Sequence, residues 1–254
     1  MILTVTLNTA LDITYRVPGL RPHASHRVRE VTERPGGKGL NVARVLAALG
    51  HEVTVTGFAG GTTGDTVRAG LTGVPGVADA LVPVAGATRR TIAVVDERTG
   101  DTTQLNEPGP AVAPAEWNAF QEAYEELLAG AAAVALCGSL PPGVPVGAYA
   151  GLVRAARAAG VPVLLDTSGE PLRRGVAARP DIIKPNADEL AELTGSHGTP
   201  RGVVARRRSW GLPRRRAGAV RPPRTFGCIV QRFFSCKSQP WRSRCPQDRT
   251  PGER

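Results

Sequence analysis

Short runs of apolar residues recur along the first 200 positions of the chain, separated by turns rich in glycine, proline and polar residues. Short segments rich in Val, Ile, Leu and Thr that are bounded by such turns are typical of strands. We therefore expect strands at residues 2–7, 53–58, 132–137, 161–166 and 181–184.

Amphipathic helices lie between these runs. A helix is predicted between Pro114 and Gly130, because its apolar side chains recur at the spacing of one helix face. Another is predicted at residues 38–49, just before Gly50. Helices that alternate with buried strands predict an α/β domain around a mostly parallel central sheet.

Two segments depart from this alternation of strand and helix. Residues 12–34 and 89–106 alternate apolar and polar side chains, which is the pattern of strands with one exposed face. We expect them to form a small β-flap that projects from the sheet and covers a site as a lid.

The regular pattern stops near residue 200. Residues 201–254 have a net charge of +13, whereas residues 1–200 have a net charge of −3. The basic composition therefore belongs to the tail alone, and it does not make nucleic acid the expected partner of the preceding domain. We expect one domain over residues 1–200 and a basic, disordered tail over residues 201–254.

Composition also bears on the location of the protein. Only Cys137 precedes residue 200, so a disulfide-stabilised fold is not expected. The first residues lack the pattern of a signal peptide, and no run approaches the roughly 18 apolar residues that a membrane span needs. We expect a cytoplasmic protein with no membrane partner.

The segment from Arg34 to Arg44, Arg-Pro-Gly-Gly-Lys-Gly-Leu-Asn-Val-Ala-Arg, is the most informative motif. Its glycines would let the backbone approach a ligand, and the following helix would present free N–H groups to an anion. Lys38 would add a positive charge for phosphate. The alternative is a glycine turn that only begins a core helix, since the segment matches neither the Walker motif nor Gly-x-Gly-x-x-Gly.

Polar residues that follow strands are further candidates, because α/β sheets bind ligands at the carboxyl ends of their strands. Asp12 would accept hydrogen bonds from sugar hydroxyls, and Ser139 would donate one to a substrate. Arg89 and Arg90, on the predicted flap, would bind a phosphate with paired donors. The structural alternative for each is an ordinary turn or surface residue.

Asn186 and Glu189 begin another predicted helix with the spacing of a capping box, in which each side chain bonds a backbone N–H near the other residue. The functional alternative places both beside a Mg²⁺–phosphate cluster, with Lys184 close by. The four histidines show no metal-ligand spacing with the cysteines, and no Ser/His/Asp arrangement is evident.

Together these segments resemble the ribokinase-like carbohydrate kinases of the phosphofructokinase B type, and most closely their 1-phosphofructokinase and tagatose-6-phosphate kinase branch. The resemblance lies in residues 6–12, 36–46, 138–143, 165–169 and 183–190, in the family order. It implies a three-layer α/β sandwich with a β-lid, a fold that would be incomplete at its C-terminal end in this chain.

The resemblance implies transfer of the γ-phosphoryl group of MgATP to a hydroxyl of a phosphorylated ketose. Fructose 1-phosphate is the expected substrate, with tagatose 6-phosphate and fructose 6-phosphate as alternatives. The lid would also provide a homodimer contact. By this resemblance, the sugar hydroxyls are bound by Asp12, Gly37 and Asn41. The phosphate already on the sugar is bound by Lys38, Arg90 and Arg27, and Ser139 lines the same pocket. ATP lies near Lys184, Asn186 and Glu189, and Glu189 orders water around Mg²⁺.

The sequence departs from the family pattern after Pro200. Family members carry a second signature, Asp-Thr-x-Gly-Ala-Gly-Asp, that supplies an anion hole and the general base, and nothing in residues 201–254 matches it. A general base contributes roughly 10²–10⁴-fold to a rate, and one anion-hole donor about 10²–10³-fold. No catalytic base is assigned, and we expect this chain to be inactive or severely impaired.

Two hypotheses account for the composition of the tail. A shifted reading frame in GC-rich DNA would yield its patternless mixture of Arg, Pro, Gly, Ser, Trp and Cys. Alternatively, its arginine triplets and interleaved Trp210 and Phe233 would bind RNA, which would make the chain a non-catalytic binding protein. A further alternative for the domain itself is a pseudokinase that binds a sugar phosphate without turnover. The sharp end of the family resemblance favours the shifted frame.

Translation of the coding DNA tests the frame-shift hypothesis. We expect a one-base correction between codons 197 and 206 to restore a Gly-Ala-Gly-Asp segment downstream, because the resemblance ends abruptly there. Resequencing from codon 190 to well beyond codon 254 is the measurement. If none of the three frames encodes that segment, the frame stands as written and the hypothesis is wrong.

Overall fold

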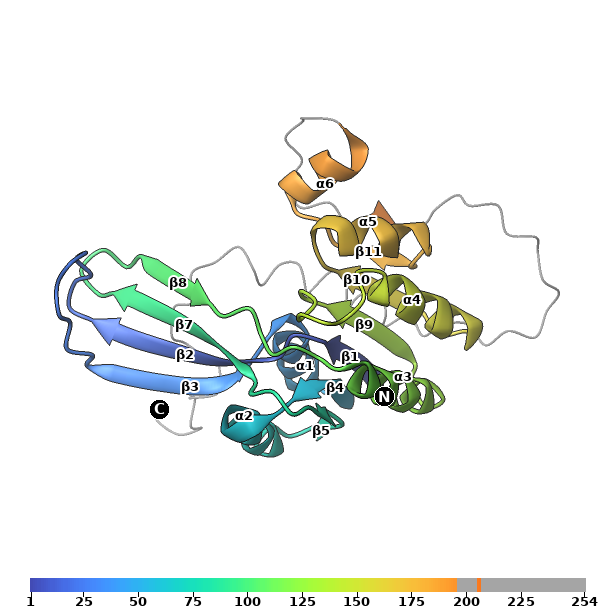
Figure 1. Cartoon of the computed structure of the whole chain (residues 1–254), viewed down its shortest axis with the longest axis horizontal. Helices are drawn as coiled ribbons and strands as arrows, with labels where there is room; N and C mark the ends of the chain where they lie inside the picture. The colour runs from blue at the N-terminus through green and yellow to red at the C-terminus, as the bar shows by residue number, and fades with distance from the viewer. Residues whose placement is uncertain (196–204, 207–254) are drawn as a thin grey trace, which may run out of the picture. The chain divides into compact units, whose positions relative to one another are not determined.

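The computed structural model describes residues 1–195 and 205–206. All of these residues belong to one compact unit, Met1–Gly211. Two sheets organise the unit, a mostly parallel central sheet and a smaller antiparallel and parallel sheet that forms a lid (Figure 1).

The central sheet contains β1 (Ile2–Thr6), β4 (Val53–Ala59), β5 (Val77–Asp79), β6 (Val82–Pro83), β9 (Ala133–Cys137), β10 (Val163–Asp166), β11 (Ile182–Ile183) and β12 (Ala205–Arg206). The strand order is β12-β11-β10-β9-β1-β4-β5, and β6 pairs with β4. All neighbours are parallel except β11 and β12. The carboxyl ends of β1, β9 and β10 therefore open at the same edge of the sheet.

The helices of the described residues are α1 (Lys38–Ala48), α2 (Gly61–Thr72), α3 (Pro114–Leu128), α4 (Ala148–Ala158), α5 (Gly169–Ala177) and α6 (Ala187–Thr194). Side chains of α3, α4 and α5 share one buried cluster with Leu3 and Val5 of β1. The neighbouring positions of β1 face the other way, and Gly39 of α1 lies against Thr6 there. Helices consequently cover both faces of the sheet, as the α/β prediction requires.

The lid consists of β2 (Ala10–Val17), β3 (Glu30–Gly36), β7 (Arg89–Asp96) and β8 (Thr102–Asn106), in the order β3-β2-β7-β8. β2 is antiparallel to β3 and parallel to β7, although β2 and β7 are far apart in the sequence. Successive residues of a strand point to opposite faces of the sheet, and directly paired residues share a face. The face that carries Arg89 and Thr91 is mostly polar and is called the inner face, and the face that carries Ile92 and Leu105 is mostly apolar and is called the outer face. Figure 1 shows this sheet projecting to one side of β1 and α1.

The structure confirms the five predicted strands, the three predicted helices and the lid built from the two alternating segments. The sequence analysis does not identify α2, α4 and α5. In α2, glycine and threonine weaken the contrast between the buried and exposed faces. Within the predicted tail only β12 is described, and the predicted disorder of the remaining tail residues lies outside the described residues. In the described ranges, no helix combines the length and apolar character that a membrane crossing requires.

Candidate active site

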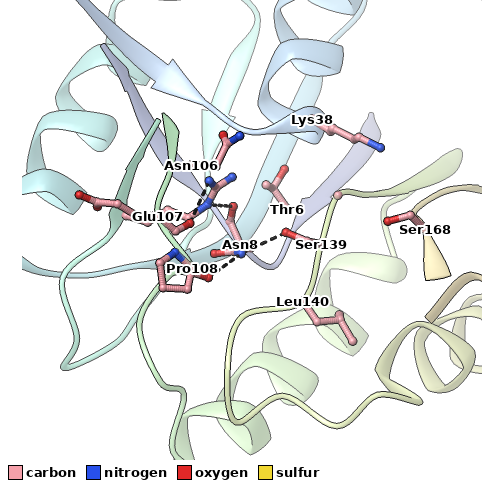
Figure 2. A pocket seen from close by; sticks show the side chains of 11 residues that line it. Thr6, Asn8, Lys38, Asn106, Glu107, Pro108, Ser139, Leu140 and Ser168 are labelled. Atoms are coloured by element: carbon pink, nitrogen blue, oxygen red, sulfur yellow. Dashed lines mark hydrogen bonds between the residues drawn. The ribbon is translucent and has the colours of Figure 1, made fainter. Parts of the chain in front are cut away.

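A cleft of about 390 Å³ opens where the carboxyl ends of β1 and β9 meet the lid. Arg89 of β7 and Asn106 of β8 line it, so the alternating segment 89–106 borders a cavity, whereas no lining residue comes from segment 12–34. Figure 2 shows the side chains that line it, which come from Thr6, Asn8, Lys38, Arg89, Asn106, Glu107, Pro108, Gly138, Ser139, Leu140 and Ser168.

Asn8 connects three parts of the chain at the floor of the cleft. Its side-chain amide donates hydrogen bonds to the Pro108 carbonyl oxygen at 3.1 Å and to Ser139 Oγ at 3.0 Å (Figure 2). Pro108 follows the last lid strand, and Ser139 follows β9. Asn8 therefore fixes the exit of the lid against the loop that carries Ser139.

Glycine is required where the chain passes over Asn8. A Cβ atom at Gly109 would lie 2.2 Å from Asn8 Oδ1, and the φ angle of Gly109 is +97°. Asn8 Oδ1 is buried and has no hydrogen-bond partner among the described residues. The close approach of the Gly109 backbone thus seals this side of the asparagine and orients its amide donors toward Pro108 and Ser139.

Arg89 places a half-buried guanidinium on the inner face of the lid. Its Nε donates to the Asn8 carbonyl oxygen at 3.2 Å, and its Nη1 donates to Thr91 Oγ1 at 3.1 Å and to the Glu107 carbonyl oxygen at 3.4 Å. Burial lowers the pKa of Arg89, and the negative charges of Asp12 and Glu107 oppose that effect. An arginine pKa is so high that the group stays charged, which provides a fixed cation for an anionic ligand.

Arg90, the predicted phosphate ligand, lies on the other face of β7, because successive strand residues point in opposite directions. It is exposed and forms an ion pair with Glu107, with 2.7 Å between Arg90 Nη2 and Glu107 Oε1. The ion pair raises the pKa of Arg90 and lowers that of Glu107. Arg90 does not line the cleft, and Arg27 lies exposed in the loop between β2 and β3.

Asp12 is half-buried on β2, next to the glycine turn before α1. Burial raises the pKa of its carboxyl group, while Arg34, Arg44 and Arg89 act in the opposite direction. A Cβ atom at Gly36 would lie only 2.1 Å from Asp12 Oδ1, so this position accommodates no side chain. Gly36 therefore leaves space for the Asp12 carboxyl group, whose ionisation is disfavoured by burial.

Asn41, which was predicted to hold sugar hydroxyls, is oriented by a neighbour on the same helix. Arg44 donates one hydrogen bond to Asn41 Oδ1 and another, of 2.7 Å, to the carbonyl oxygen of Pro35. Gly37, immediately after the lid, forms the N-cap of α1 with a φ angle of +108°. Neither Asn41 nor Gly37 lines the cleft, although both belong to the glycine-rich motif that contains Lys38.

Lys38 and Lys184 share one buried carboxylate. Lys38 Nζ lies 3.1 Å from Asp166 Oδ1, and Lys184 Nζ lies 3.3 Å from Asp166 Oδ2. Asp166 is 2% exposed at the carboxyl end of β10. The sequence motif around residues 165–169 contains Asp166, but the sequence gives no sign that two distant lysines meet there.

Asn186 and Glu189 form the predicted capping box. Asn186 Oδ1 accepts from the Glu189 backbone N–H at 2.8 Å, and Glu189 Oε2 accepts from the Asn186 backbone N–H at 2.8 Å. Both residues lie at the start of α6, outside the cleft lining. Within residues 1–195 and 205–206, no group of three or more His, Cys, Asp or Glu residues is placed to hold a metal ion.

Of the predicted residues, the structure brings Lys38, Ser139 and Arg89 of the Arg89–Arg90 pair into the cleft lining. Asn8 is the additional residue of greatest interest. Asn8 carries a readable signal, since it follows the first strand directly, as Ser139 follows β9. The choice between Arg89 and its neighbour depends on the phase of β7, which the sequence does not establish.

Comparisons with known proteins follow this geometry. The model of the pfkB family carbohydrate kinases matches residues 4–209. A 1-phosphofructokinase from Rhodobacter capsulatus is 46% identical over 195 residues, which cover 76% of this chain and 61% of the relative. The chain therefore spans about three-fifths of the length of that relative.

Solved structures of phosphofructokinases are also similar to this chain. A possible 1-phosphofructokinase from Thermotoga maritima matches with a TM-score of 0.74 and 31% identity, covering 82% of this chain and 75% of that one. Phosphofructokinase-2 from Escherichia coli, in complex with fructose-6-phosphate, matches with a TM-score of 0.71 and 34% identity, covering 76% of this chain and 64% of that one.

The raised pKa of Asp12 generates a prediction about stability. Above the folded-state pKa, ionisation of Asp12 lowers the free energy of unfolding, because burial disfavours the charged form. This effect disappears as the pH falls below the pKa of the unfolded state, about 3.9. We expect Asp12→Asn to raise the free energy of unfolding in urea at pH 7, and the gain to shrink as the pH is lowered toward 4. Asp101→Asn, an exposed lid position, is the control and should change stability by less than about 0.5 kcal/mol. A pH-independent effect of Asp12→Asn would contradict the assignment.

Proposed function

Because the chain belongs to the pfkB family of carbohydrate kinases, we propose that its cleft binds a phosphorylated ketose, with fructose 1-phosphate as the preferred substrate. The half-buried Arg89 guanidinium beside Asn8 and Ser139 is the observation that carries the proposal. It combines a fixed cation with neutral hydrogen-bonding groups, as a sugar phosphate requires. The identity to a 1-phosphofructokinase supports the choice of ketose.

Within this proposal, Arg89 binds the phosphate that the substrate already carries. Ser139, held by the Asn8 amide, provides a hydroxyl to the sugar. Asp12, with Gly37 and Asn41, accepts or donates hydrogen bonds at the sugar hydroxyls. Asp12 suits this role because a carboxylate that is partly stripped of water gains more from a hydroxyl donor than a solvated one does.

ATP is the proposed phosphoryl donor, and Lys184, Asn186 and Glu189 lie at the end of the sheet where its phosphates would bind. Glu189 uses only Oε2 in the helix cap, so Oε1 remains able to order a water molecule. The described residues offer no direct cage for a metal ion. This arrangement fits Mg²⁺, which keeps several waters and arrives bound to phosphates rather than to a protein cage. When bound, the ion would neutralise phosphate charge.

Turnover by this particular chain is expected to be very low, because residues 201–254 contain no Gly-Ala-Gly-Asp sequence. We therefore propose binding of the sugar phosphate as the measurable property of the chain, and phosphoryl transfer as the activity of its family fold. Fructose 6-phosphate is the second candidate ligand, since a structurally similar phosphofructokinase-2 is in complex with it. A cytoplasmic location remains a prediction from the sequence.

We also propose that the partner of the lid is the lid of a second copy. On the outer face of the lid, Ile92 pairs with Leu105, and Val31 pairs with Tyr15 in the next row. Val31 and Leu105 are 55% and 57% exposed. Edge positions with exposed aliphatic side chains are a liability unless a partner covers them.

Sugar-phosphate binding can be measured by isothermal titration of the full chain with fructose 1-phosphate. Arg89→Met removes the charge inside the cleft and should weaken binding about 10- to 100-fold, the usual cost of a lost charge-assisted hydrogen bond. Arg90→Met removes the same charge from the outer face and should weaken it by less than about threefold. If Arg90→Met has the larger effect, the sequence-based assignment of Arg90 is correct and the present one is wrong.

Sedimentation of the full chain tests the lid contact. We expect a dimer whose dissociation constant increases at least about tenfold with Leu105→Asp, because the substitution places a charge in an apolar contact. Val146→Asp, at an exposed aliphatic position outside the lid, is the matched control and should leave the dimer intact. A monomeric native chain would disprove the proposed contact.

A further inference from the structure

We propose that Asp166 is a positioning residue that holds Lys38 and Lys184 together as a second cationic end of the cleft, the end that receives the phosphate being transferred. The inference rests on the proposed function and revises one of its assumptions. Lys38 was expected from the sequence to bind the phosphate already on the sugar, together with Arg90. The geometry points to Arg89 for that phosphate and assigns Lys38 to the opposite end.

Asp166 is built to hold two ammonium groups. Its side chain is 3% exposed, and each carboxylate oxygen has a different lysine within 3.3 Å. Two lysines this close to one point would repel each other without an anion between them. The buried carboxylate reduces the combined charge of the three groups to +1 and fixes where the two ammonium groups lie.

The lysines keep donors for a ligand. An ammonium group has three N–H donors. Lys38 donates one of them to Asp166 Oδ1, and Lys184 forms an ion pair with Oδ2. The side chain of Lys38 is 42% exposed and lines the cleft, whereas that of Lys184 is 17% exposed. Lys38 is thus the member of the pair that is open toward the cleft, as a group that binds phosphate oxygens must be.

The lysine pair and Arg89 lie at different places along the sheet edge. Asp166 ends β10, Asn8 follows β1, and β9 lies between these two strands. Two strand spacings correspond to roughly 10 Å. Figure 2 shows Lys38 and Ser168 on the opposite side of the cleft from Asn106 and Glu107. This separation is comparable to the span of a six-carbon sugar that carries a phosphate at each end.

A comparison of two ligands tests the inference. Isothermal titration of the full chain with fructose 1-phosphate and with fructose 1,6-bisphosphate separates the two cationic ends. Lys38→Met and Asp166→Asn should each weaken the bisphosphate about 10- to 100-fold while changing the monophosphate less than about threefold. Arg89→Met should weaken both ligands. Equal losses for both ligands in Lys38→Met would overturn the inference.

Two controls separate positioning from a general loss of structure. Arg154→Met removes one positive charge from an exposed position of α4 and should alter neither affinity by more than roughly twofold. In the Lys38→Met, Lys184→Met background, Asp166→Asn should cause no further loss of bisphosphate affinity, because Asp166 acts through the two lysines. A full additional loss in that background would show that Asp166 acts independently of the lysines and would overturn the inference.

A measurement without sugar keeps the inference separable from the proposed function. The sequence has only three lysines, Lys38, Lys184 and Lys237, so their ¹⁵N-labelled ammonium signals can be assigned individually by mutation. Asp166→Asn should shift the signals of Lys38 and Lys184. If the wild-type chain binds neither sugar phosphate, the proposed function is wrong. Unchanged Lys38 and Lys184 signals in the variant would refute the positioning role, whatever the sugar result.

Discussion

The hydrogen bonds of the Asn8 amide determine how the lid sits on the central sheet. One amide nitrogen reaches both the Pro108 carbonyl oxygen, at the exit of the lid, and Ser139 Oγ, on the loop after β9. The Asn8 backbone carbonyl also accepts a hydrogen bond from Arg89. Pro108 and Ser139 lie 100 and 131 residues from Asn8 along the chain. By contacting both, Asn8 sets the distance between the Arg89 guanidinium of the lid and the Ser139 hydroxyl.

The two carboxylates of the site are held in opposite electrostatic surroundings. Asp12 is half-buried, and the cost of removing its charge from water exceeds the help of nearby arginines, so its pKa rises. Asp166 is more deeply buried, but both of its oxygens contact lysine ammonium groups. A buried charge that is fully paired serves as a scaffold, whereas one that is incompletely paired gains from a ligand donor. This difference supports Asp12 as a sugar-binding group and Asp166 as a group that organises other cations.

The lid links binding to assembly because its strands alternate strictly between two environments. Arg89 lines the cleft and Asp12 shares its face of the lid, while Arg90, Ile92 and Leu105 lie on the opposite face. A shift of one residue in the pairing of β2 with β7 would exchange the two sets. The register of β2 and β7 therefore decides which arginine lines the cleft. It also decides which aliphatic side chains lie on the outer face, where a second copy would bind.

The sequence alone determined the architecture, since buried strands, amphipathic helices and alternating lid segments each leave a periodic pattern in the chain. It also determined the capping box of Asn186 and Glu189 and the glycine turn before Lys38, because both depend on neighbours a few residues away. Tertiary structure alone decided that Asn8 joins the lid to the loop of Ser139, that Arg89 rather than Arg90 lines the cleft, and that Asp166 pairs with two lysines. Each of these contacts joins residues from different elements, and their formation depends on strand order and register. Local periodicity contains no information about either, because the same pattern of apolar and polar residues is compatible with several ways of pairing the strands.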